Sequence, residues 1–282
     1  MWERVCIVWW TRSIEIVHVA LLVLGRAAQL LERALHVGLH VVRRHVEPLV
    51  GRVLGGAPGV SGKEPGQFNG PTDVAYDGEA LFVADSKNNR VQKLRLADGA
   101  HLGCAGRADC GNGVGKGEFH FPAGMCLAAG TLYVCDAGNS RVVALGTALT
   151  WRYAFRAPGL EAPIGVVAHD GELYVVDNTA DCVRVFAPGQ DGRMQFRRSF
   201  GGFGSTPGKF NRPVGIAAVR GSLVVSENEG DGRVQVLSPA GVPLQVLAHK
   251  SSCSGICADA QRVWVTDSYR NRVIVLKIRE AV

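Results

Sequence analysis

The chain has 282 residues, of which 47% are hydrophobic, and it contains 36 glycines and 12 prolines. This composition excludes an intrinsically disordered chain and is typical of short strands joined by tight turns. The formal net charge of +6 at pH 7 is too small, by itself, to indicate a nucleic-acid-binding protein.

Residues 1–49 are expected to form a separate N-terminal segment. The apolar run 16–24 is shorter than the roughly 20 residues that span a bilayer. From Arg26 to Glu47 apolar residues recur every three or four positions, which predicts an amphipathic helix that ends at Pro48. Its apolar side has three possible partners: the rest of the chain, another protein, or a membrane surface. Membrane contact through residues 14–47 is the option we do not favour.

Residues 50–282 repeat one pattern five times. A unit starts with an opener such as Pro122-Ala123-Gly124, and an apolar strand such as Leu132–Asp136 follows about ten residues later. A polar turn then leads to a third strand that begins at a pair such as Arg141-Val142. A period of about 40–50 residues with several short strands is typical of propeller blades. We therefore predict an all-β chain, a β-propeller with five recognisable four-stranded blades, over residues 50–282.

The acid that ends each second strand is predicted to be structural. A carboxylate at this position can accept backbone N–H groups from the following turn, and the arginine about five residues later can pair with it. A catalytic group would not be needed five times. The proposed turn acids and arginines are Asp85, Arg90, Asp136, Arg141, Asp177, Glu227, Arg233, Asp267 and Arg272.

Several runs of the chain resemble NHL repeats. They are Gly66–Pro71, Asp85–Val91 and Gly208–Pro213, and the resemblance covers roughly residues 50–282. It implies a β-propeller and most often a scaffold that binds a protein or a peptide. Two units depart from the pattern, because the third has Cys182 in place of the arginine and the fourth has Glu227 with an extra residue before Arg233. The bridge across the turn is in doubt in both.

The ends of the chain leave the blade number open. Val50–Leu54 reads as an outer strand without inner strands, and the last unit has three strands without an outer one. Pairing the two ends would close a ring of five and remove exposed edges. The alternative is a degenerate sixth blade built from Val5–Trp10 and Ile14–Val23.

The eight cysteines do not have the spacing of a metal site, so no metal and no cofactor is expected. Cys126 and Cys257 occupy a repeat position that otherwise holds a small apolar residue, and we expect both in the core. The sequence leaves open whether Cys104 and Cys110 form a disulfide.

The loops before the openers and the turns after the acids should lie together on one face of the propeller, called here the loop face. Its candidate residues for binding a partner or RNA are cations: Lys63, Lys87, Lys116, Lys209, Arg212 and Arg270. These charges could attract an acidic protein or the phosphates of single-stranded RNA. No exposed aromatic set for base stacking is evident in the sequence.

Three functions remain open at this stage. The favoured one is a non-catalytic scaffold that binds a protein or peptide through the loops or the mouth of the channel. The second is an RNA-binding propeller, and DNA is not expected. The third is a metal-dependent enzyme that resembles lyase or lactonase propellers. Asp73 replaces the opener glycine and is the single candidate to line the channel. The compartment is not determined, with a cytoplasmic location slightly favoured over a secreted or membrane-associated one.

Overall fold

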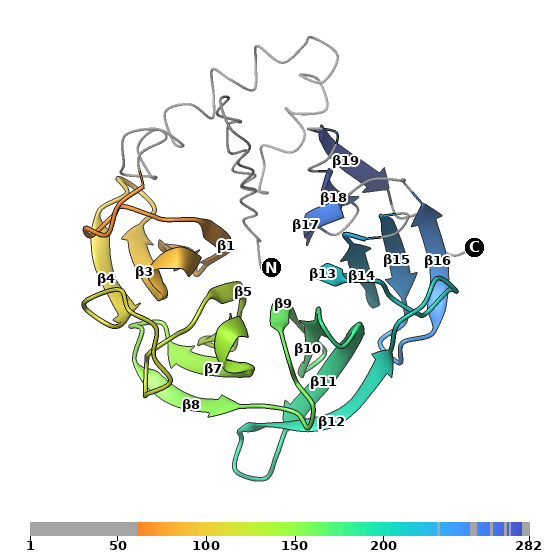
Figure 1. Cartoon of the computed structure of the whole chain (residues 1–282), viewed down its shortest axis with the longest axis horizontal. Helices are drawn as coiled ribbons and strands as arrows, with labels where there is room; N and C mark the ends of the chain where they lie inside the picture. The colour runs from red at the N-terminus through yellow and green to blue at the C-terminus, as the bar shows by residue number, and fades with distance from the viewer. Residues whose placement is uncertain are drawn as a thin grey trace.

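The computed structural model describes residues 61–229, 232–248, 253–259, 262–267, 270 and 272–277. These residues form five antiparallel sheets arranged as blades around one axis (Figure 1). The predicted five-bladed β-propeller is confirmed. The predicted N-terminal helix, the strand at Val50–Leu54 and the alternative sixth blade lie outside the described residues.

Each blade is a meander in which consecutive strands pair. Blade 1 contains β1 (Pro71–Tyr76), β2 (Ala80–Asp85), β3 (Arg90–Arg95) and β4 (His101–Gly106). Blade 2 contains β5 (Pro122–Ala128), β6 (Thr131–Asp136), β7 (Arg141–Gly146) and β8 (Trp151–Phe155). Blade 3 contains β9 (Pro163–His169), β10 (Glu172–Asp177), β11 (Cys182–Pro188) and β12 (Met194–Gly201).

Blade 4 contains β13 (Pro213–Val219), β14 (Ser222–Glu227), β15 (Arg233–Leu237) and β16 (Pro243–Ala248). Blade 5 has three described strands, β17 (Cys253–Ala258), β18 (Arg262–Asp267) and β19 (Arg272–Lys277). Two short 3-10 helices, η1 (Ser86–Asn88) and η2 (Ala137–Asn139), form the turns that follow the acids of blades 1 and 2.

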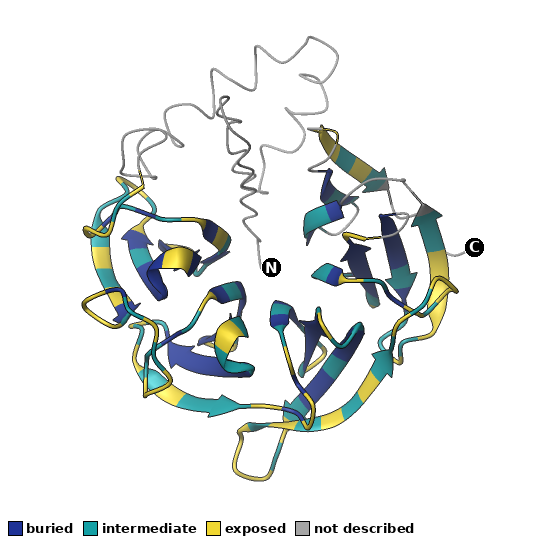
Figure 2. Ribbon diagram, viewed as in Figure 1, coloured by how far each residue is buried: buried dark blue, intermediate teal, exposed yellow. Residues whose placement is uncertain are grey.

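The core lies between blades, so the central strands are apolar on both faces. Every residue of β6 is buried, including the alternating Leu132 and Tyr133. Leu132 packs with Phe82 of blade 1, whereas Tyr133 packs with Leu173 of blade 3. Figure 2 shows the same contrast, with buried inner strands and outer strands that alternate between intermediate and exposed residues. A blade therefore needs both of its neighbours to bury its apolar surface.

The innermost strands converge on the axis, where β5 contacts β1 and β9, and β13 contacts β9 and β17. A Cβ added at Gly124 would lie 2.4 Å from the carbonyl oxygen of Ile164, and one at Gly165 would lie 2.7 Å from that of Val214. Such contacts are too close for any side chain. The opener glycines are thus required by the approach of neighbouring backbones. Cys126 and Cys257 are buried, as predicted.

Within the described residues, no helix has the length and apolar character needed to cross a membrane. Residues 14–47, for which membrane contact was considered, lie outside this part of the chain.

Candidate interaction face

The turn acid of blade 1 is a fully buried hub of hydrogen bonds. Asp85 has no exposed surface, and its Oδ1 accepts the backbone N–H of Asn69 at 2.7 Å. Its Oδ2 accepts Nε of Arg90 at 2.8 Å and Nδ2 of Asn88 at 2.9 Å. Nε2 of Gln92 donates to the same oxygen at 3.1 Å. A buried carboxylate is tolerated only with such a set of donors.

The arginine of this hub also holds the loop in front of the opener. The terminal nitrogens of Arg90 donate to the carbonyl oxygens of Lys63 (2.6 Å), Glu64 (3.1 Å) and Gln67 (2.8 Å). Because these loop carbonyls have no strand partner, the guanidinium satisfies them and gives the loop one conformation. In blade 2, Arg141 pairs with Asp136 at 2.7 Å and holds the carbonyls of residues 114, 115 and 118 in the same way.

Blade 4 keeps the bridge in spite of its extra residue. Nε of Arg233 donates to Oε1 of Glu227 at 3.2 Å, and its terminal nitrogens bind Oε2 and the carbonyl of Lys209. The longer glutamate side chain spans the additional residue of the turn. In blade 5, Nε of Arg272 lies 2.8 Å from Oδ2 of Asp267, and the arginine side chain is 47% exposed.

In blade 3 another arginine of the third strand, β11, takes the role of the missing arginine. Cys182 is buried at the arginine position, and Arg184, two residues later, donates to Oδ2 of Asp177 at 3.2 Å. Arg184 also donates to the carbonyls of Pro158 and Gly159 in the preceding loop. Residues two apart in a strand project from the same face, so the guanidinium reaches the same carboxylate. The sequence contained this signal, because Arg184 aligns with Gln92 of blade 1.

Residues in the left-handed region connect each turn to the next blade. Asn89, Ser140 and Asp181 have φ values of 52°, 50° and 51° and occupy the same turn position. Oδ1 of Asn89 accepts the N–H of Phe121, Oγ of Ser140 donates to the carbonyl of Glu161, and Oδ1 of Asp181 accepts the N–H of Arg212. The loop face is therefore a cross-linked surface rather than a set of independent loops.

The six candidate cations of the loop face are all exposed. Nζ of Lys209 donates to the carbonyl of Gly201 at 2.8 Å, and Arg212 lies 3.7 Å from Glu229. Within the described residues, the ammonium groups of Lys63, Lys87 and Lys116 make no hydrogen bond and no ion pair. The buried arginines of the acid bridges do not add to the charge that a partner would meet.

The loop face also exposes apolar side chains, which the sequence did not indicate. Val114 is 65% exposed, Phe121 48% and Phe203 75%. Two of these side chains are aromatic, although no exposed aromatic set was evident in the sequence. The loops that carry Phe121 and Phe203 each contain a second phenylalanine, which is buried. Phe119 and Phe210 point into the core, and Phe121 and Phe203 point outward.

Asp73 is half-buried and joins two blades. Its Oδ2 accepts the backbone N–H of Met125 in β5 at 2.6 Å, and its Oδ1 accepts the N–H of Val74. The other openers have a glycine at this position, where the backbones of two neighbouring blades approach closely. In blade 1 the carboxylate of Asp73 bridges the two backbones instead. Both oxygens are engaged in hydrogen bonds to the backbone.

Within the described residues, no three His, Cys, Asp or Glu side chains lie close enough together to hold a metal ion. Burial and the charge of Arg90 lower the pKa of His101. Cys104 and Cys110 are both free thiols, the first exposed and the second buried. Burial raises the pKa of Cys135 well above its usual value.

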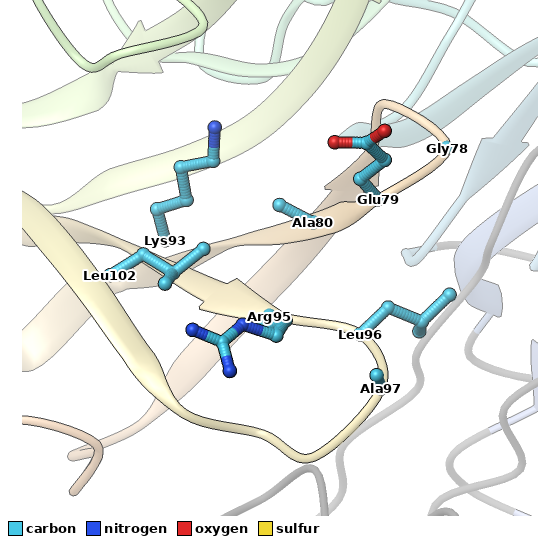
Figure 3. A pocket seen from close by; sticks show the side chains of 8 residues that line it. All are labelled: Gly78, Glu79, Ala80, Lys93, Arg95, Leu96, Ala97 and Leu102. Atoms are coloured by element: carbon cyan, nitrogen blue, oxygen red, sulfur yellow. The ribbon is translucent and has the colours of Figure 1, made fainter.

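A pocket of about 580 Å³ opens on blade 1, at the end opposite the loop face (Figure 3). Its lining combines Ala80, Leu96 and Leu102 with Glu79, Lys93 and Arg95. Nζ of Lys93 donates to the carbonyl of Thr147 at 2.9 Å, and Arg95 pairs with Asp98. The two cations therefore already have partners, and the pocket has no set of converging groups to which chemistry can be assigned.

The family model described as NHL repeat matches residues 68–94 and 119–145. These segments run from the opener loop into the third strand of blades 1 and 2. The chain is therefore a five-bladed β-propeller in which blades 1 and 2 match the NHL repeat. A search of curated proteins found no sequence similar to this one.

Solved structures with the same architecture have different functions. Virginiamycin B lyase from Staphylococcus aureus matches with a TM-score of 0.54 and 14% identity, over 74% of this chain and 66% of the lyase, just under two thirds of its length. A nidogen/laminin complex matches with a TM-score of 0.55 and 20% identity, over 71% of this chain and 72% of the other.

The β-propeller domain of Cps50 (Swd1) from Myceliophteria thermophila matches with a TM-score of 0.55 and 10% identity, over 73% and 68% of the two chains. At these identities the likeness shows the fold alone, since one fold supports many unrelated activities.

Proposed function

We propose that this propeller is a non-catalytic interaction scaffold whose loop face binds an acidic segment of a protein or peptide. One observation carries the proposal: loops held rigid by buried acid–arginine bridges present lysines and apolar side chains side by side. Lys116 and Val114 extend from the same loop, whose carbonyls are bound by Arg141. A rigid, pre-organised surface loses little conformational entropy when a partner binds.

Peptide binding is favoured over RNA binding by the balance of charge. The loop face that carries the lysines also carries exposed acids: Glu64, Asp109, Glu161 and Glu229. An RNA strand carries one phosphate per nucleotide and requires a continuous row of cations. A peptide with a few carboxylates and an apolar side chain matches this mixed surface better.

The test is a charge reversal on each face of the propeller. Binding of fluorescein-labelled acidic peptides from a random library is measured by anisotropy for the wild type and for K63E/K87E/K116E. The matched control, R95E/R193E/R220E, makes the same charge change at turns of the opposite face. We expect the first triple variant to bind at least tenfold more weakly and the control to bind as the wild type does.

Two outcomes would contradict the proposal. Equal loss of affinity in both triple variants would show that net charge, and not the loop face, drives binding. Tighter binding of single-stranded RNA than of any acidic peptide, with a strong decrease at high salt, would favour the RNA alternative.

A further inference from the structure

Blade 2 differs from the other described blades at the two residues before its opener proline. His120 and Phe121 stand there, where blade 1 has Asn69-Gly70, blade 3 has Glu161-Ala162 and blade 4 has Asn211-Arg212. The openers are the innermost strands, so these residues lie on the loop face beside the axis (Figure 1). Blade 2 thus presents an aromatic pair close to the mouth of the channel.

The backbone of Phe121 has a conformation that favours glycine. Its φ is 51°, close to the 59° of Gly70 in blade 1 and the 53° of Arg212 in blade 4 at the equivalent positions. A bulky side chain is unfavourable at positive φ, a cost that a glycine would avoid. Since the side chain of Phe121 is 48% exposed, its burial offsets only part of this cost. Strained residues of this kind are concentrated at binding sites.

Neighbouring groups fix the position of the Phe121 ring. The N–H of Phe121 donates to Oδ1 of Asn89 at 3.0 Å. The His120 ring packs against it, with ring centres 4.9 Å apart. His120 is itself held by its N–H, which donates to Asp136 at 2.7 Å, and its ring lies so close to Gly138 that a Cβ there would clash with Nδ1 at 2.4 Å. The aromatic pair is pre-organised before any ligand arrives.

The turn of blade 1 that binds the backbone of Phe121 through Asn89 also carries a lysine. Lys87 lies two residues before Asn89 in the turn that holds Phe121, and its N–H donates to the carbonyl of Asn69. Its side-chain carbons pass over Gly70, where an added Cβ would lie 3.0 Å from Cγ and Cδ. The ammonium group is exposed, and it has no hydrogen-bond or ion-pair partner among the described residues. An aromatic ring and a cation therefore flank the junction of blades 1 and 2.

We infer that Phe121, His120 and Lys87 form the specificity site of the loop face, which takes an aromatic side chain next to a carboxylate in the partner peptide. This inference rests on the proposed function. The partner's ring packs against Phe121, an arrangement that contributes beyond simple burial, and its carboxylate accepts a charge-assisted hydrogen bond from Lys87. The strain at Phe121 is then the cost of presenting the ring to the partner.

The probes are two fluorescein-labelled acidic peptides of eleven residues that differ at the centre, where one has Glu-Trp-Glu and the other Glu-Ala-Glu. The wild type is expected to bind the tryptophan peptide at least tenfold more tightly, as for a buried aromatic anchor. The variant Phe121→Gly should bind both peptides alike. Its matched control is Phe203→Ala, which removes an exposed phenylalanine from the loop of blade 4 and should keep the preference.

Thermal unfolding separates loss of the site from loss of the fold. Phe121→Gly removes the unfavourable backbone conformation, so its melting temperature should not fall below that of the wild type. Phe121→Asn is the second variant, because asparagine also tolerates positive φ, and it should lose the preference in the same way.

Each remaining outcome has one meaning. If Phe121→Gly and Phe121→Asn keep the preference for tryptophan, the inference fails while the proposed function stands. If the wild type binds neither peptide, the proposed function fails as well. If Phe121→Gly weakens the binding of a single-stranded oligouridine and leaves the peptides unaffected, the ring serves RNA stacking and the inference is overturned.

Discussion

In blade 2 the arginine that pairs with the turn acid is the first residue of the third strand, whereas in blade 3 it is the third residue of that strand. Arg141 reaches Asp136 with its Nε at 2.7 Å, and Arg184 reaches Asp177 at 3.2 Å. Both then bind carbonyls of the loop in front of the opener. Each of these blades thus has a guanidinium beside its turn acid. Either the first or the third residue of the third strand can supply it, because both project from the same face of the strand.

The comparison also shows what the bridge does. Asp136 has no exposed surface, so its charge depends on hydrogen-bond donors from three segments of blade 2: the opener loop, the turn and the third strand. Loss of the arginine leaves the carboxylate buried and the loop carbonyls unsatisfied. The bridge is therefore expected to stabilise the blade and to shape the loop face at the same time.

The largest effect is expected for Arg141→Ala in blade 2. This variant leaves Asp136 without its charged partner and should lower the free energy of unfolding by about 3–5 kcal/mol. Urea unfolding followed by circular dichroism measures it. Arg156→Ala is the control, because Arg156 is exposed and has no ion pair among the described residues, and its effect should stay within about 0.5 kcal/mol. Equal effects of the two variants would show that the bridge does not stabilise the blade.

A smaller effect is expected for Arg184→Ala in blade 3, because its bonds to Asp177 are longer. We expect a loss of about 1.5–3 kcal/mol in the free energy of unfolding. The double variant Cys182→Arg/Arg184→Val copies the residues Arg141 and Val143 of blade 2 and should recover at least half of that loss. If the double variant is no more stable than Arg184→Ala, the two strand positions are not equivalent.

The smallest expected effect concerns the reactivity of the Cys182 thiol. Burial raises the pKa of its thiol to about 11, so on the order of one thiol in a thousand is ionised at pH 8. Native protein treated with iodoacetamide should react at Cys182 at least tenfold more slowly than at the exposed Cys104, as followed by mass spectrometry. Equal labelling of the two thiols would mean that Cys182 is not a packed core residue.

The repeat made most of the fold predictable. Openers, acid-ending strands and arginine-led strands marked the first three strands of every blade, because their pattern follows from burial on both faces and from tight turns. Four strands per blade were also predicted, and the structure has four in blades 1 to 4. The opener glycine was part of the predicted repeat, and the structure shows that crowding at the axis requires it.

The candidate site was predictable only in part. The lysines of the loop face were found from strand alternation, and they are exposed. The role of Arg184 and the outward position of Phe121 were missed, since both residues differ in type from their counterparts in the other blades. For Arg184 the alignment with Gln92 was an available signal. For Phe121 the available signal was its alignment with Gly70, which has a similar positive φ.

By itself, the order of residues determined the five units, their strands and the acids that end them, because these depend on local pattern and on burial within a repeat. The contacts that hold the opener loops, and the choice of which phenylalanine of the blade 2 loop enters the core, were decided only by the tertiary structure. These outcomes depend on distances between segments 16 to 32 residues apart in the chain, such as those that join Asn69 to Asp85 and Asn89 to Phe121. No local pattern encodes them, since they arise when the blades meet around the axis.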